Sequence, residues 1–103
     1  MKLIKSKKLA KIKNLKHGFF NSIGGYSKNI YKSLNCGPGS LDNKKNIKKN
    51  LQLVRKKISK KAKNIFLLHQ VHSNKLIFID EKYSNKNKPE ADAIITNQRN
   101  LPI

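Results

Sequence analysis

With 103 residues, the chain is long enough for one small domain and too short for two independent hydrophobic cores. Hydrophobic residues make up only 37% of it, so the core is expected to be thin or to be completed by something else. The formal net charge of +19 predicts attraction to anions but does not specify a partner.

The positive charge comes almost entirely from lysine, because Arg55 and Arg99 are the only arginines. Specific reading of phosphates or bases favours the forked guanidinium of arginine. A coding bias toward AT-rich codons would give the same surplus of Lys, Asn and Ile without selection. We therefore interpret the lysines mainly as a solvated surface and expect no specific nucleic-acid partner. A small lysine-rich nucleic-acid-binding module is the alternative.

Cysteine usage and hydropathy indicate the compartment. Cys36 is the single cysteine, so an intramolecular disulfide is excluded and the cytoplasm is the expected location. Residues 1–16 alternate lysine with short apolar stretches and lack the hydrophobic region of a signal peptide. No segment approaches the roughly 18 apolar residues of a membrane span, so no membrane partner is expected.

In the first third of the chain, residues 1–16 fit either a short edge strand or a basic helix. Residues 17–20, His-Gly-Phe-Phe, predict a strand that runs into a loop at Gly24 and Gly25. A double glycine there indicates positive φ or a close approach of the backbone. Residues 35–40, Asn-Cys-Gly-Pro-Gly-Ser, cannot continue a helix and predict a shaped loop.

An amphipathic helix is predicted over residues 43–60, with Asp42 in the N-cap position. The lysines of this segment fall mostly off its apolar side, and no aromatic residue interleaves them to stack bases. A solvated face is therefore favoured over an RNA-binding helix. The apolar side is formed by Ile47, Leu51, Val54 and Ile58.

Three strands are predicted after this helix. Residues 64–68 form a continuous apolar run, as expected for a strand buried on both faces, and Leu76–Ile79 and Ala93–Thr96 are two further short strands. Together the elements predict an α/β or α+β fold, a mixed β-sheet with flanking helices. The apolar restart at residues 101–103 indicates another strand, so residues 1–103 are interpreted as the truncated N-terminal portion of a single domain.

Four segments, in chain order, resemble motifs of one family. Residues 17–27 contain His-Gly-Phe-Phe and a Gly-Gly-Tyr-Ser turn, and residues 31–37 read Tyr-Lys-Ser-Leu-Asn-Cys-Gly. Residues 70–72 are Gln-Val-His, and residues 91–96 are Ala-Asp-Ala-Ile-Ile-Thr. This series resembles the YfiH-like laccase-domain family, also known as the polyphenol oxidase family. The helix from Asp42 to Asn50 is similar to the acidic-start helix of that family.

The resemblance implies a zinc-dependent purine nucleoside phosphorylase that acts on adenosine, inosine and methylthioadenosine and also deaminates adenosine. Purine nucleoside and phosphate are then the expected partners, while the oligomeric state is not indicated. Copper-dependent, laccase-like polyphenol oxidation is a further alternative implied by the same resemblance.

The resemblance also implies one metal ligand, His72, as the histidine of Gln-Val-His. The other two family ligands, a Cys and a His in later segments, have no counterpart before Ile103, so the isolated fragment is expected to be inactive. Asn35 and Ser27 lie on glycine-flanked loops and are candidate substrate-binding residues, with turn hydrogen bonds as the open alternative. No catalytic residue is assigned. Leu51 stands where the family has Arg, so that arginine contact is not carried over to this chain.

The remaining candidate residues favour structural roles. His69 lies three residues before the predicted ligand, and an odd offset on an extended chain points to the opposite face. Cys36 is interpreted as a small residue packed under its loop, and His17 is assigned no functional role because the sequence shows no partner for it. Asp92 is left open between orienting a histidine and beginning a strand.

Overall fold

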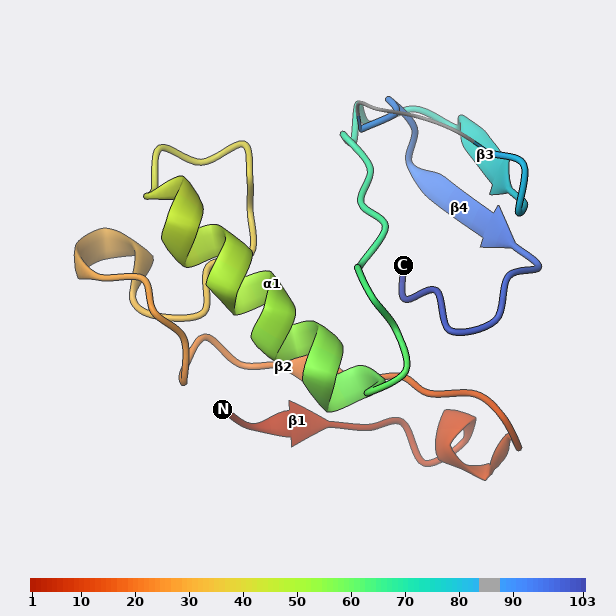
Figure 1. Cartoon of the computed structure of the whole chain (residues 1–103), viewed down its shortest axis with the longest axis horizontal. Helices are drawn as coiled ribbons and strands as arrows, with labels where there is room; N and C mark the ends of the chain where they lie inside the picture. The colour runs from red at the N-terminus through yellow and green to blue at the C-terminus, as the bar shows by residue number, and fades with distance from the viewer. Residues whose placement is uncertain (84–87) are drawn as a thin grey trace. The chain divides into compact units, whose positions relative to one another are not determined.

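The computed structural model describes residues 1–83 and 88–103 and divides into two compact units, residues 1–60 and 61–103 (Figure 1). The described residues contain one α-helix and two two-stranded sheets, one antiparallel and one parallel. The predicted α+β combination is confirmed. That the chain is a portion of a single domain stays a prediction.

The first unit opens with an antiparallel pair in which β1 (Leu3–Ile4) lies beside β2 (Phe19–Phe20). Between them lies a 3-10 turn, η1 (Leu9–Lys11), so the N-terminal segment is part strand and part helical turn. The Nε2 atom of His17 accepts a hydrogen bond from the backbone N–H of Ser6 at 2.8 Å. That contact closes the loop between the strands and agrees with a structural role for the histidine.

Two adjacent glycines turn the chain between β2 and the 3-10 helix η2 (Asn29–Tyr31). Gly24 has a φ of +98°, a conformation that L side chains rarely adopt. At Gly25 a Cβ atom would lie 2.1 Å from the carbonyl oxygen of Ser33 and 2.6 Å from Oδ1 of Asn50. Both predicted reasons for the double glycine are therefore confirmed, one at each residue.

The amphipathic helix forms as α1 (Lys44–Ile58). Its N-cap is Asn43, whose side chain accepts from the backbone N–H groups of the second and third helical residues. The prediction of Asp42 as N-cap is wrong by one residue. The physical reason is that the Asp42 carboxylate is engaged by two loop side chains, described below.

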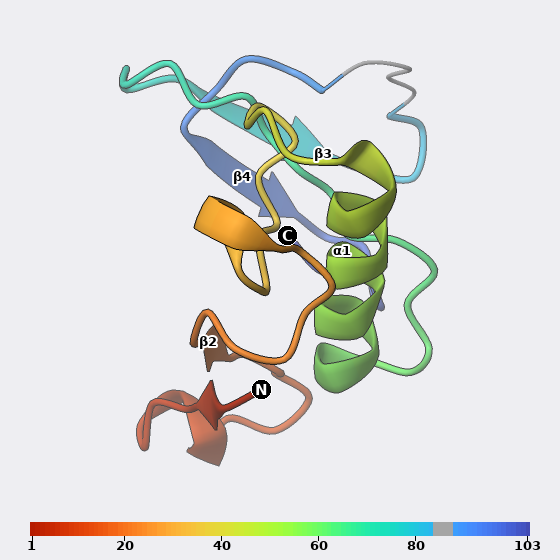
Figure 2. The ribbon, with the colours of Figure 1, turned by 90° about the vertical axis from the view of Figure 1, so that its left-hand side faces the viewer.

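The apolar side of α1 faces the loops between β2 and the helix, which run alongside it in Figure 2. Ile47 is buried, and Leu51, Val54 and Ile58 are half-buried, so the predicted packing face is confirmed. Its most deeply buried side chain is nevertheless polar, because Asn50 has an exposed fraction of 0%.

The second unit contains β3 (Leu76–Ile79) and β4 (Ala93–Thr96), which pair in parallel with the bounds that the sequence predicted. The hydroxyl of Thr96 donates to the carbonyl oxygen of Ile79 at 2.7 Å and closes the end of the pair. Ile79 is buried, whereas Phe78 on the other face is half exposed.

The predicted strand over residues 64–68 does not form. The backbone N–H of Phe66 donates to the carbonyl oxygen of Pro102, and that of His69 donates to Pro89. Proline has no N–H with which to return a hydrogen bond. Each of the two prolines therefore accepts one bond, and no continuous ladder of strand hydrogen bonds forms. The apolar side chains of the segment are half-buried.

No helix among the described residues is long and apolar enough to cross a membrane.

Candidate functional site

The loop that carries His72 is held by a single carboxylate, that of Asp92, just before β4. One oxygen of Asp92 accepts from the backbone N–H groups of Val71 at 3.1 Å and His72 at 2.8 Å. The other accepts from the backbone N–H of Ser73 at 2.8 Å and from its hydroxyl at 2.5 Å. Four hydrogen bonds thus fix three consecutive residues against the start of the strand.

The backbone of His72 is left-handed, with a φ of +57°, while its side chain is exposed. Such a conformation costs about 1 kcal/mol in a residue with a Cβ, and it persists where surrounding contacts impose it. Here the Asp92 carboxylate supplies those contacts. The result is an imidazole presented to solvent from a fixed backbone.

The hydrogen bonds that Asp92 accepts also favour the ionised form of its carboxyl group. The hydroxyl of Ser73 contributes most to lowering the pKa of this carboxyl, followed by the backbone N–H groups of Ser73, His72 and Val71, and desolvation opposes them. The carboxylate is ionised at neutral pH and serves as an acceptor for the loop.

His69 precedes this loop and is tied through its backbone. Its backbone N–H donates to the carbonyl oxygen of Pro89, and its carbonyl oxygen accepts from the N–H of Ala91 at 3.2 Å. These two bonds form an isolated parallel bridge between His69 and Glu90. The side chain is exposed. In residues 1–83 and 88–103, no three His, Cys, Asp or Glu side chains group together as a metal site would require.

The two predicted substrate-binding residues, Ser27 and Asn35, meet in the first unit. The hydroxyl of Ser27 and the side-chain N–H of Asn35 both donate to the same oxygen of Asp42, at 2.5 Å and 3.1 Å. Asn35 also donates to the hydroxyl of Ser40. Both residues therefore take part in loop hydrogen bonds, the alternative that the sequence left open, and their contact with a substrate stays a prediction.

Asn50 joins these loops to α1. Its Oδ1 accepts from the backbone N–H of Tyr26 at 2.7 Å, and its Nδ2 lies 2.9 Å from the hydroxyl of Ser27. The same Nδ2 donates to the carbonyl oxygens of Ser33 at 3.2 Å and Asn35 at 2.8 Å. One buried amide thus satisfies four groups on the loops between β2 and α1.

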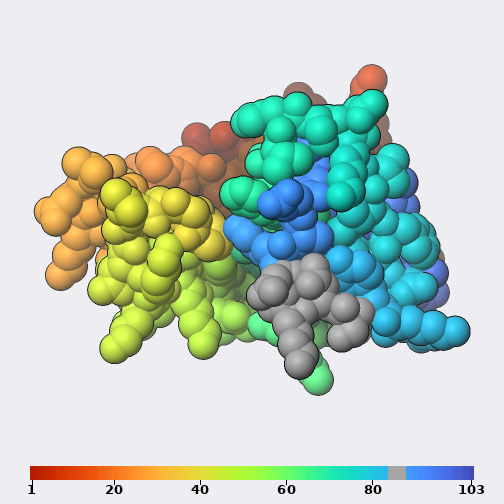
Figure 3. All heavy atoms as spheres, turned by 90° about the horizontal axis from the view of Figure 1, so that it is seen from above, coloured from red at the N-terminus to blue at the C-terminus, as the bar shows by residue number. Residues whose placement is uncertain are grey.

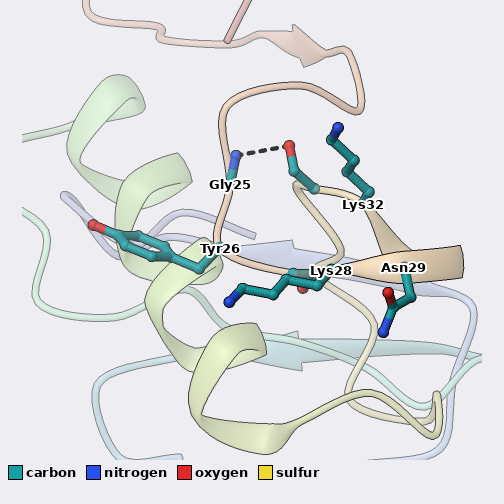
Figure 4. Close-up of a pocket in the computed structure, with 7 residues that line it drawn as sticks. Gly25, Tyr26, Lys28, Asn29 and Lys32 are labelled. Atoms are coloured by element: carbon teal, nitrogen blue, oxygen red, sulfur yellow. Dashed lines mark hydrogen bonds between the residues drawn. The ribbon is translucent and has the colours of Figure 1, made fainter.

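A shallow hollow of about 510 Å³ lies over this network, lined by residues 25–29, 32 and 33 (Figure 4). In the close-up, Lys28 and Lys32 carry their ammonium groups in different directions, and Asn29 lies to one side. A dashed line marks the bond from the N–H of Gly25 to the Ser33 hydroxyl, 3.1 Å long. The charged groups do not converge on a point, so the hollow is not built for a small anion.

Acid is expected to weaken the first unit through Asp42. Hydrogen bonds from Ser27, then Asn35 and the backbone of Asn43, lower the pKa of this carboxyl against desolvation. A lowered folded-state pKa gives stability that is present above the unfolded value of 3.8 and lost as pH falls through the folded value. In the wild type, the urea concentration at the midpoint of unfolding should fall between about pH 5.5 and about pH 2.5. We expect this fall to be smaller in Asp42→Asn. Glu90→Gln serves as the matched control, and an Asp42→Asn curve parallel to that of the wild type would contradict this role.

Sequence reasoning missed Asn50 and left Asp92 unresolved. A signal for Asn50 was present, because it lies three residues after Ile47 and four before Val54, inside the apolar side of the helix. A polar residue at such a position is buried and must be hydrogen-bonded. The position of Asp92 beside residues 71–73 depends on the pairing of distant segments, and nothing local in the sequence shows it.

Residues 16–103 match the family model described as multi-copper polyphenol oxidoreductase laccase. The chain belongs to this laccase-domain family. A comparison with curated proteins gave no match.

The family description names copper, so the described residues of this laccase-domain chain can be tested as metal ligands. His72 fits as one ligand, because its ring is exposed and its backbone is fixed. Cys36 does not fit, because it is half-buried and burial raises the pKa of its thiol, which disfavours the thiolate that binds metals. One imidazole is not a complete site, and further ligands would have to come from outside the described residues.

Proposed function

We propose that this chain contributes one metal ligand, His72, to a laccase-domain enzyme that cleaves purine nucleosides by phosphorolysis. The observation that carries the proposal is the left-handed, exposed His72 held by the Asp92 carboxylate. A histidine kept in a costly backbone conformation, with its ring free, is typical of a functional residue.

The chemistry of the proposed reaction sets what the site must do. A phosphate oxygen forms a bond to C1′ of the ribose as the bond from C1′ to the purine nitrogen breaks, and the leaving purine takes up the proton that the phosphate gives up. A bound zinc ion would supply Lewis acidity near the reacting groups. The role of His72 is to donate a ring nitrogen, while Asp92 fixes the loop from which the ring extends. Adenosine deamination is part of the same proposal.

A second candidate is oxidation of phenolic compounds, which the family description favours by naming a polyphenol oxidoreductase. It requires copper in place of zinc, and imidazole is a good ligand for both metals. His72 alone does not discriminate between them. The distinction therefore needs a direct assay.

The test uses the complete gene product loaded separately with zinc and with copper. We expect the zinc form to release hypoxanthine from inosine only when phosphate is present, with formation of ribose 1-phosphate. Oxidation of a phenolic substrate by the copper form, without phosphorolysis by the zinc form, would replace the first proposal with the second. Absence of both activities would contradict both.

A further inference from the structure

The positive charge of the chain is concentrated in the first unit. Residues 1–60 hold sixteen lysines, one arginine and a single carboxylate, a net charge of +16, whereas residues 61–103 account for the remaining +3. That carboxylate, Asp42, is occupied by internal hydrogen bonds. A uniform coding bias does not explain why acidic residues are so scarce in one unit and not in the other.

The outer side of α1 carries a line of exposed lysines. Lys45, Lys49 and Lys56 follow one another at spacings of four and seven residues, so they lie along one side of the helix over about 16 Å. This side is opposite the buried Ile47 and Asn50. The segment that contains the first turns of α1, yellow to yellow-green in Figure 3, forms an uneven, protruding part of the surface of the first unit.

Lys45 and Lys49 form no ion pair within the helix that carries them, whereas Lys56 lies in the last turn, where the helix dipole favours positive charge. Residues 44–58 contain no Asp or Glu, so no lysine of α1 has a carboxylate partner within the helix. Lys44 and Lys45 lie in the first turn, where the helix dipole favours negative charge. The first turn of this basic side therefore carries a cost in stability that an external anion would relieve.

An aromatic ring stands beside this line of lysines. The ammonium nitrogen of Lys49 lies 5.2 Å from the ring centroid of Tyr26, which comes from the loop after β2 and is 49% exposed. Figure 4 shows the Tyr26 ring directed toward the helix. The backbone of Tyr26 is anchored by its bond to Asn50, so the ring projects from a fixed point. In the sequence, Tyr26 is remote from α1, and only the fold brings the two together.

We propose that Lys45, Lys49 and Lys56 together with Tyr26 bind single-stranded nucleic acid without sequence preference. The lysines neutralise successive phosphates, and the exposed ring stacks a base, the combination that single-strand-binding surfaces use. An anionic membrane fits less well, because the apolar side of α1 faces inward.

The first test measures fluorescence anisotropy of a labelled oligouridylate with the 103-residue chain at several salt concentrations. Replacing Lys45, Lys49 and Lys56 by glutamine should weaken binding roughly tenfold or more and reduce the slope of log K against log salt by about two. Glutamine retains the helix propensity of lysine, which circular dichroism checks. The matched control replaces three exposed lysines outside α1, Lys5, Lys8 and Lys11, by glutamine. Equal losses in the two triple variants would show a general charge effect and overturn the proposal.

The second test separates stacking from charge at Tyr26. We expect Tyr26→Ala to weaken binding roughly tenfold and Tyr26→Phe to leave it nearly unchanged, because a phenyl ring also stacks a base. Weaker binding to a duplex of equal phosphate number is expected. No loss in Tyr26→Ala would overturn the proposal. So would binding to phosphatidylserine vesicles without binding to the oligonucleotide.

Discussion

Replacing His72 by alanine in the complete gene product is expected to lower its zinc content and its rate of inosine phosphorolysis by more than about a hundredfold. Loss of a ligand exceeds the effect of removing a residue that only orients one, which is typically about 10- to 100-fold. The physical reason is that the loop presents this ring, and no other, from a backbone fixed by Asp92. Metal analysis and product formation measure the two effects.

His69→Ala is the matched control, because it removes the same ring three residues earlier while the backbone bridge to Glu90 stays possible. It should retain metal and activity. Asp92→Asn is expected to weaken zinc binding roughly tenfold, since a neutral amide holds the N–H groups of the loop less strongly. Unchanged metal content in His72→Ala, or equal losses in the two histidine variants, would remove His72 from the site.

Replacing Asn50 by alanine is expected to lower the free energy of unfolding by about 3 kcal/mol. The side chain is fully buried and forms four hydrogen bonds, so its removal leaves several loop groups without partners and a cavity behind. Urea unfolding followed by far-UV circular dichroism measures the change.

Asn46→Ala is the control for that prediction. It removes the same atoms from α1 four residues earlier, at a position that is only half-buried. We expect its stability to stay within about 0.5 kcal/mol of the wild type. Similar losses in both variants would mean that the effect comes from the helix and not from the buried amide.

Local patterns predicted much of the fold. The helix near residues 43–60 and the strands Leu76–Ile79 and Ala93–Thr96 follow from periodicity, and the turn at Gly24 follows from the freedom of glycine. The motifs also predicted the family correctly. Each of these features depends on residues close together in the chain.

Features that depend on distant residues were not predictable in this way. Residues 64–68 have the composition of a buried strand, but the carbonyl groups that Phe66 and the following His69 meet both belong to prolines. The helix is capped by Asn43 and not by Asp42, because loop side chains already form hydrogen bonds with the Asp42 carboxylate. The networks around Asn50 and Asp92 join segments about 20 residues apart, and their geometry exists only once the chain has folded.

The most direct test of the central claim is anomalous X-ray diffraction at the zinc edge from crystals of the complete gene product. The account predicts a zinc ion about 2.0–2.1 Å from a ring nitrogen of His72, with the N–H groups of residues 71–73 still bonded to Asp92. Zinc bound elsewhere, with the His72 ring directed into solvent and no metal within bonding distance, would contradict it.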